Sequence, residues 1–259
     1  MKHALNASNA LLEEDHLAFD IPRQAQLTNM SLAMQTLYNC MNAGSSMPRF
    51  GVFYGNSGYG KTVAAAFAAS VTDAAYIEAR SIWTVKTFLR ALAIALGIAA
   101  PAKTAADLLE QIIASLNAQP RPLIIDEMDH LVKKQAVDIL RDIHDATSVA
   151  ILMIGEEALP SKLKEWERFD NRILESTPAQ PASTDDVLKL RDYYCDRVNV
   201  ADDLALHIGT VCRFVTRRVV TNLKRVQDTA LQAGINTADR AWWGNRAIIN
   251  GDLLTRRSV

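Results

Sequence analysis

The sequence is poor in the features that mark several common classes of protein. It has three cysteines, Cys40, Cys195 and Cys212, which lie far apart and show no C-x-x-C or Cys/His ligand spacing. We therefore expect neither a disulfide framework nor a zinc site, and we predict that each cysteine is a small buried side chain. No apolar run approaches the roughly 20 uncharged residues of a membrane helix. The N-terminus, with early acids at Glu13–Asp15, lacks a signal-peptide pattern, so the expected location is the cytoplasm.

Sequence signatures of base-reading DNA-binding modules are missing as well. There is no helix-turn-helix, zinc finger or aromatic stacking platform, so any nucleic-acid binding would use phosphate contacts and depend strongly on salt. The net charge is −1. Residues 205–259 nevertheless hold nine Lys/Arg against three Asp, a local charge of +6, and the remainder carries −7. This asymmetry permits an anionic partner, whereas the pI near 6.5 argues against indiscriminate nucleic-acid binding.

The most informative stretch is Gly55–Thr62, which reads G-x-x-x-x-G-K-T. A strand-like run, Phe50–Tyr54, precedes it and the alanine-rich segment Val63–Ser70 follows, so a strand, a loop and a helix are predicted in the order that a phosphate-binding loop requires. Glycines let successive backbone N–H groups turn toward a polyphosphate, and the helix N-terminus adds partial positive charge. Lys61 is expected to reach the β- and γ-phosphates, and the Thr62 hydroxyl to ligate Mg²⁺. The predicted nucleotide contacts are Gly55, Asn56, Ser57, Gly58, Tyr59, Gly60, Lys61, Thr62 and Val63.

A second stretch, Leu123–Glu127, is an apolar run that ends in two acids. This pattern is typical of a parallel strand buried on both faces, and the carboxyl ends of such strands border the ligand crevice of an open α/β sheet. Asp126 is expected to hold the Mg²⁺ hydration shell, and Glu127 to orient or deprotonate the attacking water. Together with the phosphate loop, these acids predict an ATP-hydrolysing domain with ATP and Mg²⁺ as its cofactors.

The remaining pattern predicts alternating helices and strands. Strands are expected at 74–79 and 149–155, and helices at 24–42, 83–96, 104–116 and 129–146. The methionine stripe of the 24–42 helix favours core packing over a binding role. Repeated βα units predict an α/β fold with a doubly wound parallel sheet.

The segment 177–182, rich in proline and alanine, is the best domain boundary in the chain. Helices are predicted after it from Ser183 and at 202–212, 214–234 and 237–249, and they are expected to form a small lid. The 214–234 helix is expected to have one apolar arc, formed by Val215, Val219, Leu223, Val226 and Ala230. The predicted division is an N-terminal arm at 1–22, a nucleotide-binding α/β domain at 23–177, a helical lid at 183–250 and a basic tail at 251–259.

The motifs at 55–62, 123–127, 151–157 and 169–173 resemble those of the AAA+ ATPases. Within that family, the stretch 124–131, the Gly-Glu-Glu-Ala-Leu turn at 155–159 and the Phe-x-x-Arg-Ile run at 169–173 resemble the transposition helpers of the phage Mu B and TnsC/TniB type. The resemblance implies a bacterial or phage-encoded ATPase that assembles into rings or filaments on DNA, recruits a transposase and selects the target.

The resemblance also implies roles for single residues. Arg172 is similar to the arginine finger that reaches the γ-phosphate of a neighbouring subunit, with Arg168 as a substitute, although a solvated arginine remains an alternative. Glu156 occupies the sensor position, where the family usually carries a neutral polar residue. Arg217 resembles the second sensor, which touches the γ-phosphate. The candidate DNA contacts are Arg80, Lys86, Arg90 and Lys103.

Two other functions remain open. A AAA+ helicase loader would share the ATPase and the DNA but would bind a replicative helicase. A nucleotide-gated scaffold ATPase would not bind DNA at all. The two tryptophans Trp242 and Trp243 and the Arg256-Arg257 tail fit either a partner surface or, equally well, interior packing and a disordered end.

Overall fold

The structure, a computed structural model, describes residues 27–44, 47–132 and 137–251. The expected N-terminal arm, residues 24–26 of the helix predicted at 24–42, and the Arg256-Arg257 tail lie outside the described residues. Within the described residues, no helix is both long and apolar enough to cross a membrane.

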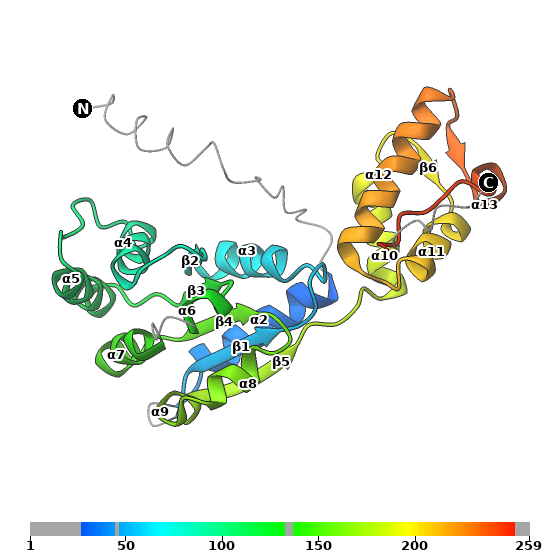
Figure 1. The fold of residues 1–259 in the computed structure, drawn as a ribbon. Coiled ribbons are helices and arrows are strands. Elements are labelled where there is room, and N and C mark those ends of the chain that lie inside the picture. Colours follow the sequence, from blue (N-terminus) through cyan, green and yellow to red (C-terminus); the bar gives the residue numbers. More distant parts are fainter. Residues whose placement is uncertain (1–26, 45–46, 133–136, 252–259) are drawn as a thin grey trace, which may run out of the picture.

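The chain forms an α/β sheet domain followed by a separate group of helices (Figure 1). The elements of the first part are α2 (Thr28–Met41), β1 (Phe50–Tyr54), α3 (Lys61–Thr72), β2 (Ala75–Glu78), α4 (Val85–Ala95), α5 (Ala105–Ala118), β3 (Leu123–Asp126), α6 (Asp129–Val132), α7 (Val137–Thr147), β4 (Ile151–Gly155), α8 (Leu159–Lys164), α9 (Glu167–Asp170) and β5 (Ile173–Pro178). The elements of the second part are α10 (Thr184–Tyr194), β6 (Asn199–Val200), α11 (Asp202–Val211), α12 (Thr216–Gln232), β7 (Thr237–Ala238) and α13 (Arg240–Trp243).

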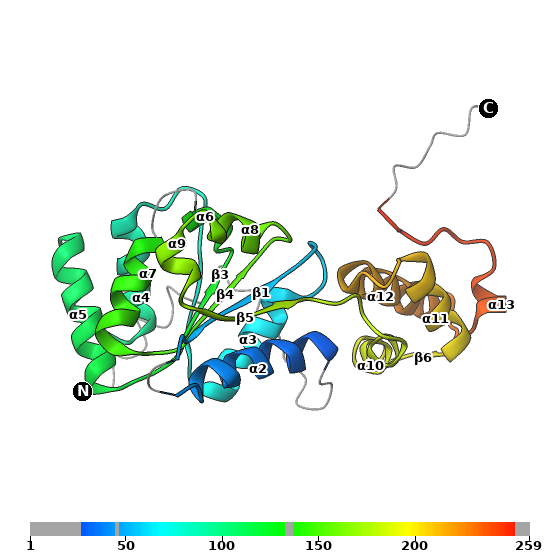
Figure 2. The same cartoon turned by 90° about the horizontal axis from the view of Figure 1, so that it is seen from below.

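The five-stranded sheet has the order β2-β3-β4-β1-β5, and every neighbouring pair is parallel. Helices α2 and α3 cover one face, and α4, α5 and α7 lie on the other (Figure 2). The prediction of a doubly wound parallel sheet is therefore confirmed. All five residues of β4 are buried, as expected for a strand covered on both faces.

The second part, which we call the lid (residues 182–251), has its own hydrophobic core. The apolar arc predicted for its long helix faces that core, with Val219, Leu223, Val226 and Ala230 fully buried in α12. Ser183 and Asp186 form a reciprocal capping box at the start of α10. All three cysteines are buried and unpaired, as predicted.

Three predictions of secondary structure need correction. The strand β5 was not predicted, because its polar residues at 175–177 lack the apolar pattern of a buried strand, and it lies at the sheet edge. The single helix predicted over 129–146 is described as two segments, α6 and α7, with residues 133–136 outside the described part. Only Arg240–Trp243 of the helix predicted at 237–249 is helical: β7 pairs with β6 before it, and Gly244, which has φ +57°, follows its last residue.

Candidate functional site

The phosphate loop connects the carboxyl end of β1 to the first turn of α3, as the motif predicts. Gly58 and Gly60 have φ values of +86° and +83°, a left-handed backbone region that favours glycine because glycine has no Cβ. The Lys61 ammonium lies over the loop and donates to the carbonyl oxygens of Gly55 at 2.7 Å and Asn56 at 3.1 Å. The loop and its lysine are therefore preorganised in a compact turn.

Asp126 ends β3 beside this loop, and it is 1% exposed. Its carboxylate accepts hydrogen bonds from the Glu127 backbone N–H at 2.8 Å and from the Tyr76 hydroxyl at 3.3 Å, and it lies beside the Thr62 hydroxyl. Burial raises the pKa of Asp126, and these three neighbouring donors partly oppose that shift. Thr62 and Asp126, the two predicted Mg²⁺ ligands, are thus in contact across the loop.

Glu127 follows in a left-handed backbone conformation, with φ +53°. Such a conformation is uncommon for a residue with a side chain, and here it turns Glu127 into the cavity described below. Burial and the adjacent carboxylate of Asp126 raise the pKa of Glu127. Burial also lowers the pKa of Lys61, partly offset by the carboxylates of Glu127 and Asp126.

A cavity of about 500 Å³ opens between the phosphate loop and the lid. The sheet domain lines it with the loop itself, Glu127, Glu156 and residues 27, 29 and 30 around the start of α2. The lid lines it with basic, apolar and hydroxyl side chains and with one acid, Asp186. Those lid residues include Ala182, Leu190, Tyr193, Tyr194, Arg217, Val220 and Lys224. One end of the cavity therefore offers backbone amides and charge, and its apolar lining fits a purine ring.

Direct hydrogen bonds join the lid to the phosphate loop. The Arg217 N–H donates to the Gly58 carbonyl at 3.0 Å, and the Thr216 hydroxyl donates to the Tyr59 carbonyl at 3.4 Å. A Cβ on Gly58 would come within 2.9 Å of Val215 Cγ1, so the lid packs closely on the loop. The start of α12, including the predicted second sensor Arg217, is positioned by this contact.

Asn29 of α2 closes the site from the other side. Its amide donates to the carbonyl oxygens of Tyr59 and Gln180, both at 2.8 Å, and its oxygen accepts from the Gln180 N–H at 2.8 Å. Because it is 7% exposed and fully bonded, Asn29 fixes the segment that leads into the lid against the phosphate loop. This role of Asn29 was not predicted, since a single polar residue on an apolar helix face carries no motif.

Glu156 follows β4 on the cavity wall, and its side chain is 71% exposed. Its N–H donates to Asp129 Oδ2 at 2.7 Å, and its carboxylate lies 4.0 Å from the Lys162 ammonium. No role was predicted for Asp129, Lys162 or Tyr76. The repeated acid of the Asp-Glu-Met-Asp run was the one available signal for Asp129.

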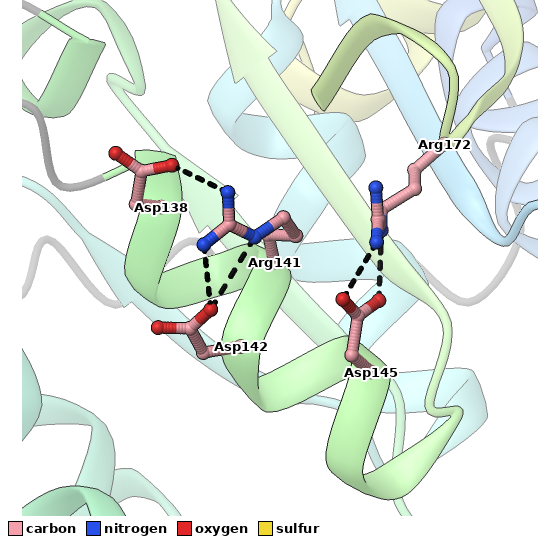
Figure 3. A network of polar contacts seen from close by, with 5 residues as sticks. All are labelled: Asp138, Arg141, Asp142, Asp145 and Arg172. Carbon is pink, nitrogen blue, oxygen red and sulfur yellow. Dashed lines mark hydrogen bonds and ion pairs between the residues drawn. The ribbon is translucent and has the colours of Figure 1, made fainter. Parts of the chain in front are cut away.

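Arg172 lies between α9 and β5, and its guanidinium pairs with Asp145 of α7 (Figure 3). The two bonds are 2.7 Å from Nε and 2.6 Å from Nη2. They lower the pKa of Asp145, chiefly through the hydrogen bond. Arg141, one turn before Asp145, bridges Asp138 and Asp142 on the same helix.

Arg172 lies at the amino ends of the parallel strands, whereas the phosphate loop of its own chain follows the carboxyl end of β1. It precedes β5, and its carbonyl accepts from the N–H of Phe50, the first residue of β1. The length of β1, five residues, puts roughly 16 Å between that point and the loop. Arg172 does not line the cavity, so any contact it makes with a nucleotide is with that of another subunit.

The four candidate DNA contacts are all exposed, and none lines the cavity. Arg80 follows β2 at the carboxyl edge of the sheet, Lys86 and Arg90 lie one turn apart on α4, and Lys103 precedes α5. Their role stays a prediction, as do the roles of Arg172, Arg217 and Glu156. The Arg168 side chain lies outside what the structure describes.

The residues present fit a magnesium–nucleotide complex. Turned backbone amides and Lys61 suit a polyphosphate, while the Thr62 hydroxyl and the Asp126 carboxylate offer the oxygen donors that Mg²⁺ prefers. Among the described residues, Arg217 and Lys224 add positive charge from the lid side of the cavity.

Comparison with known proteins supports this interpretation. Residues 45–163 match the family model described as the AAA domain. Curated protein sequences show no significant match. Over residues 45–163 the sequence therefore matches an AAA-type P-loop ATPase domain.

Solved structures with this fold include archaeal ORC and Cdc6 proteins. The Aeropyrum pernix ORC2 protein in its ADP form superposes with a TM-score of 0.68 at 17% identity, over 89% of this chain and 69% of that one. The ORC1 protein of the same organism, in complex with DNA, superposes with a TM-score of 0.64 at 17% identity, over 87% of this chain and 66% of that one. Cdc6p from Pyrobaculum aerophilum superposes with a TM-score of 0.59 at 16% identity, over 88% of this chain and 67% of that one. At these identities the likeness establishes the fold, and the transposition-helper subtype stays a prediction.

Proposed function

We propose that this chain is an ATP-hydrolysing, DNA-binding AAA+ protein that oligomerises on DNA and recruits a transposase for target selection. The observation that carries the proposal is the cavity between the phosphate loop and the lid, where Lys61, Glu127 and Arg217 converge. A nucleotide bound there touches both parts of the chain. Its hydrolysis would then change how the lid sits on the sheet domain.

Phosphate binding, Mg²⁺ binding and proton transfer are assigned to different residues of the site. Lys61 and the loop amides bind the phosphates, and the hydroxyl of Thr62 and the carboxylate of Asp126 hold Mg²⁺, which when bound neutralises charge on the phosphate oxygens. The Glu127 carboxylate accepts the proton of the attacking water. Its position next to Asp126 and its raised pKa suit a base that works near neutral pH. Arg217 reads the terminal phosphate from the lid.

Hydrolysis is proposed to depend on assembly. Arg172 does not reach the nucleotide of its own chain, and a finger arginine from the next subunit completes the charge stabilisation of the transition state. This arrangement makes ATP hydrolysis a timer for the oligomer, because only assembled subunits have complete sites.

DNA binding is proposed to run through phosphate contacts of Arg80, Lys86, Arg90 and Lys103. Support comes from their exposure and from the fold shared with the A. pernix ORC1 protein, which was solved in complex with DNA. The likeness in fold to ORC and Cdc6 proteins also keeps a helicase loader as a second candidate. Affinity capture on ATP-bound protein separates the two, since one recruits a transposase and the other a replicative helicase.

The test is electron microscopy and a DNA filter-binding assay with ATP. Wild type is expected to form rings or filaments on DNA that dissolve as ATP is consumed, with affinity that falls steeply as salt rises. Lys61→Ala should lose nucleotide binding, and Glu127→Gln should bind ATP and keep the assembly from dissolving. A Glu127→Gln protein that stays a monomer indifferent to DNA would refute the proposal.

A further inference from the structure

Glu156 brings a carboxylate to the proposed nucleotide site, and its side chain is 71% exposed. Glu156 lines the cavity, and the preceding residue, Gly155, accepts a hydrogen bond from the N–H of Gly55 at the start of the phosphate loop. A carboxylate at this point repels the terminal phosphate of ATP more strongly than it repels ADP, which ends one phosphate earlier. The site therefore needs a positive charge that offsets Glu156.

Lys162 of α8 supplies that charge. Its ammonium lies 4.0 Å from Glu156 Oε2 and forms an ion pair with Asp129 Oδ1. The hydrogen bond to Asp129 raises the pKa of Lys162. The Lys162 side chain is 28% exposed and that of Glu156 is 71% exposed, so solvent partly screens the interaction between them.

Asp129 holds both partners from a buried position. Its side chain is 6% exposed, and its two oxygens are both used, one by the Lys162 ammonium and the other by the Glu156 N–H. A Cβ on Gly155 would come within 2.3 Å of Asp129 Oδ2, so the turn and the carboxylate are in close contact. A second bond, from the Met128 N–H to the Ile154 carbonyl at 2.8 Å, joins the same two segments.

We propose that Asp129 and Lys162 are positioning residues that set the preference of the site for nucleoside triphosphate over diphosphate. Asp129 fixes Lys162 beside Glu156, and the Lys162 ammonium, which is shared between these two carboxylates, weakens the repulsion that Glu156 exerts on the terminal phosphate. The inference rests on the proposed nucleotide site and adds a charge-compensating device to it. It also accounts for an acid at a sensor position that is usually neutral.

The experiment measures the Kd of a non-hydrolysable ATP analogue and of ADP by calorimetry, so no turnover is required. Lys162→Met should weaken the ATP analogue about tenfold and ADP less than about threefold, because Glu156 is then uncompensated. Glu156→Gln alone should change either Kd less than about threefold. The double variant Glu156→Gln/Lys162→Met should return the ATP analogue to within about threefold of wild type, a rescue that a merely structural role of Lys162 does not produce.

Two further variants complete the design. Lys164→Met removes an exposed lysine from the same helix and should leave both Kd values unchanged. Asp129→Asn leaves one acceptor oxygen for two donors, so it should weaken the ATP analogue in part, again with rescue by Glu156→Gln. If thermal melting shows that Lys162→Met is unfolded, the comparison of Asp129→Asn with the double variant Asp129→Asn/Glu156→Gln tests the inference instead.

Equal losses for ATP and ADP, or no rescue by Glu156→Gln, would overturn the inference while leaving the nucleotide site intact. A folded wild-type protein that binds neither nucleotide would overturn the proposed site and this inference together. Selective loss of ATP affinity with rescue supports it.

Discussion

Replacing Arg172 separates a role in a neighbouring subunit from a role in stability. The ion pair with Asp145 joins side chains that are 28% and 45% exposed. A pair this exposed contributes about 0.2 to 1 kcal/mol to folding. Its loss should therefore lower the melting temperature by no more than about 2–4 °C for a chain of this size. An arginine that completes the site of the next subunit contributes about 10³-fold or more to kcat.

The assay is phosphate release by Arg172→Ala in the presence of saturating DNA and ATP. We expect unchanged nucleotide affinity, a nearly unchanged melting temperature and at least about a thousandfold loss of hydrolysis. Arg141→Ala is the matched control, because Arg141 also pairs with acids of α7 and has no proposed contact across subunits (Figure 3). It should hydrolyse ATP at nearly the wild-type rate.

Mixing two inactive proteins tests the geometry directly. Arg172→Ala has an intact phosphate loop, and Lys61→Ala has an intact Arg172, so a mixed assembly should regain activity at interfaces where the two complement each other. An Arg172→Ala protein that hydrolyses ATP within a few-fold of wild type would refute the reasoning. So would a loss of activity that mirrors the loss of folded protein, since Arg172 would then act through its pair with Asp145.

Two further predictions concern acid stability and the lid contact. Arg172 lowers the pKa of Asp145 in the folded protein, so the pair stabilises the fold at any pH above about 4, the pKa of an aspartate in the unfolded chain. This contribution is lost as the pH falls through the lower pKa that Asp145 has in the folded protein. Urea unfolding should show the difference between wild type and Arg172→Ala at pH 5 shrinking toward zero near pH 2; a constant difference would contradict it. Gly58→Ala should weaken nucleotide binding about tenfold or more, because its Cβ meets Val215 Cγ1 at 2.9 Å. Gly97→Ala, with φ +79° and no atom within 4 Å of its Cβ, carries the same backbone strain of about 1 kcal/mol without the clash and should bind normally.

The positions of the central strands and of the phosphate loop were predictable from the sequence. A glycine-rich loop between a strand and a helix is a local structure, and its geometry follows from the residues within it. Asp126 and Glu127 were placed for a related reason: parallel strands end at one edge of the sheet, so acids that end a buried strand lie near a loop that follows another. Short polar segments such as β5 and β7 were missed because their pairing depends on neighbours and leaves no period in the sequence.

The sequence by itself determined an AAA-type phosphate loop, an acidic strand end and a lid helix with one apolar face, since each is written in contiguous or periodic residues. Only the tertiary structure decided how they meet. Three contacts show this: Arg217 bonds to Gly58, Arg172 pairs with Asp145, and Asp129 pairs with Lys162. Each contact joins residues about 27 or more positions apart. Such contacts depend on how sheet, helices and lid pack, and no local pattern encodes them.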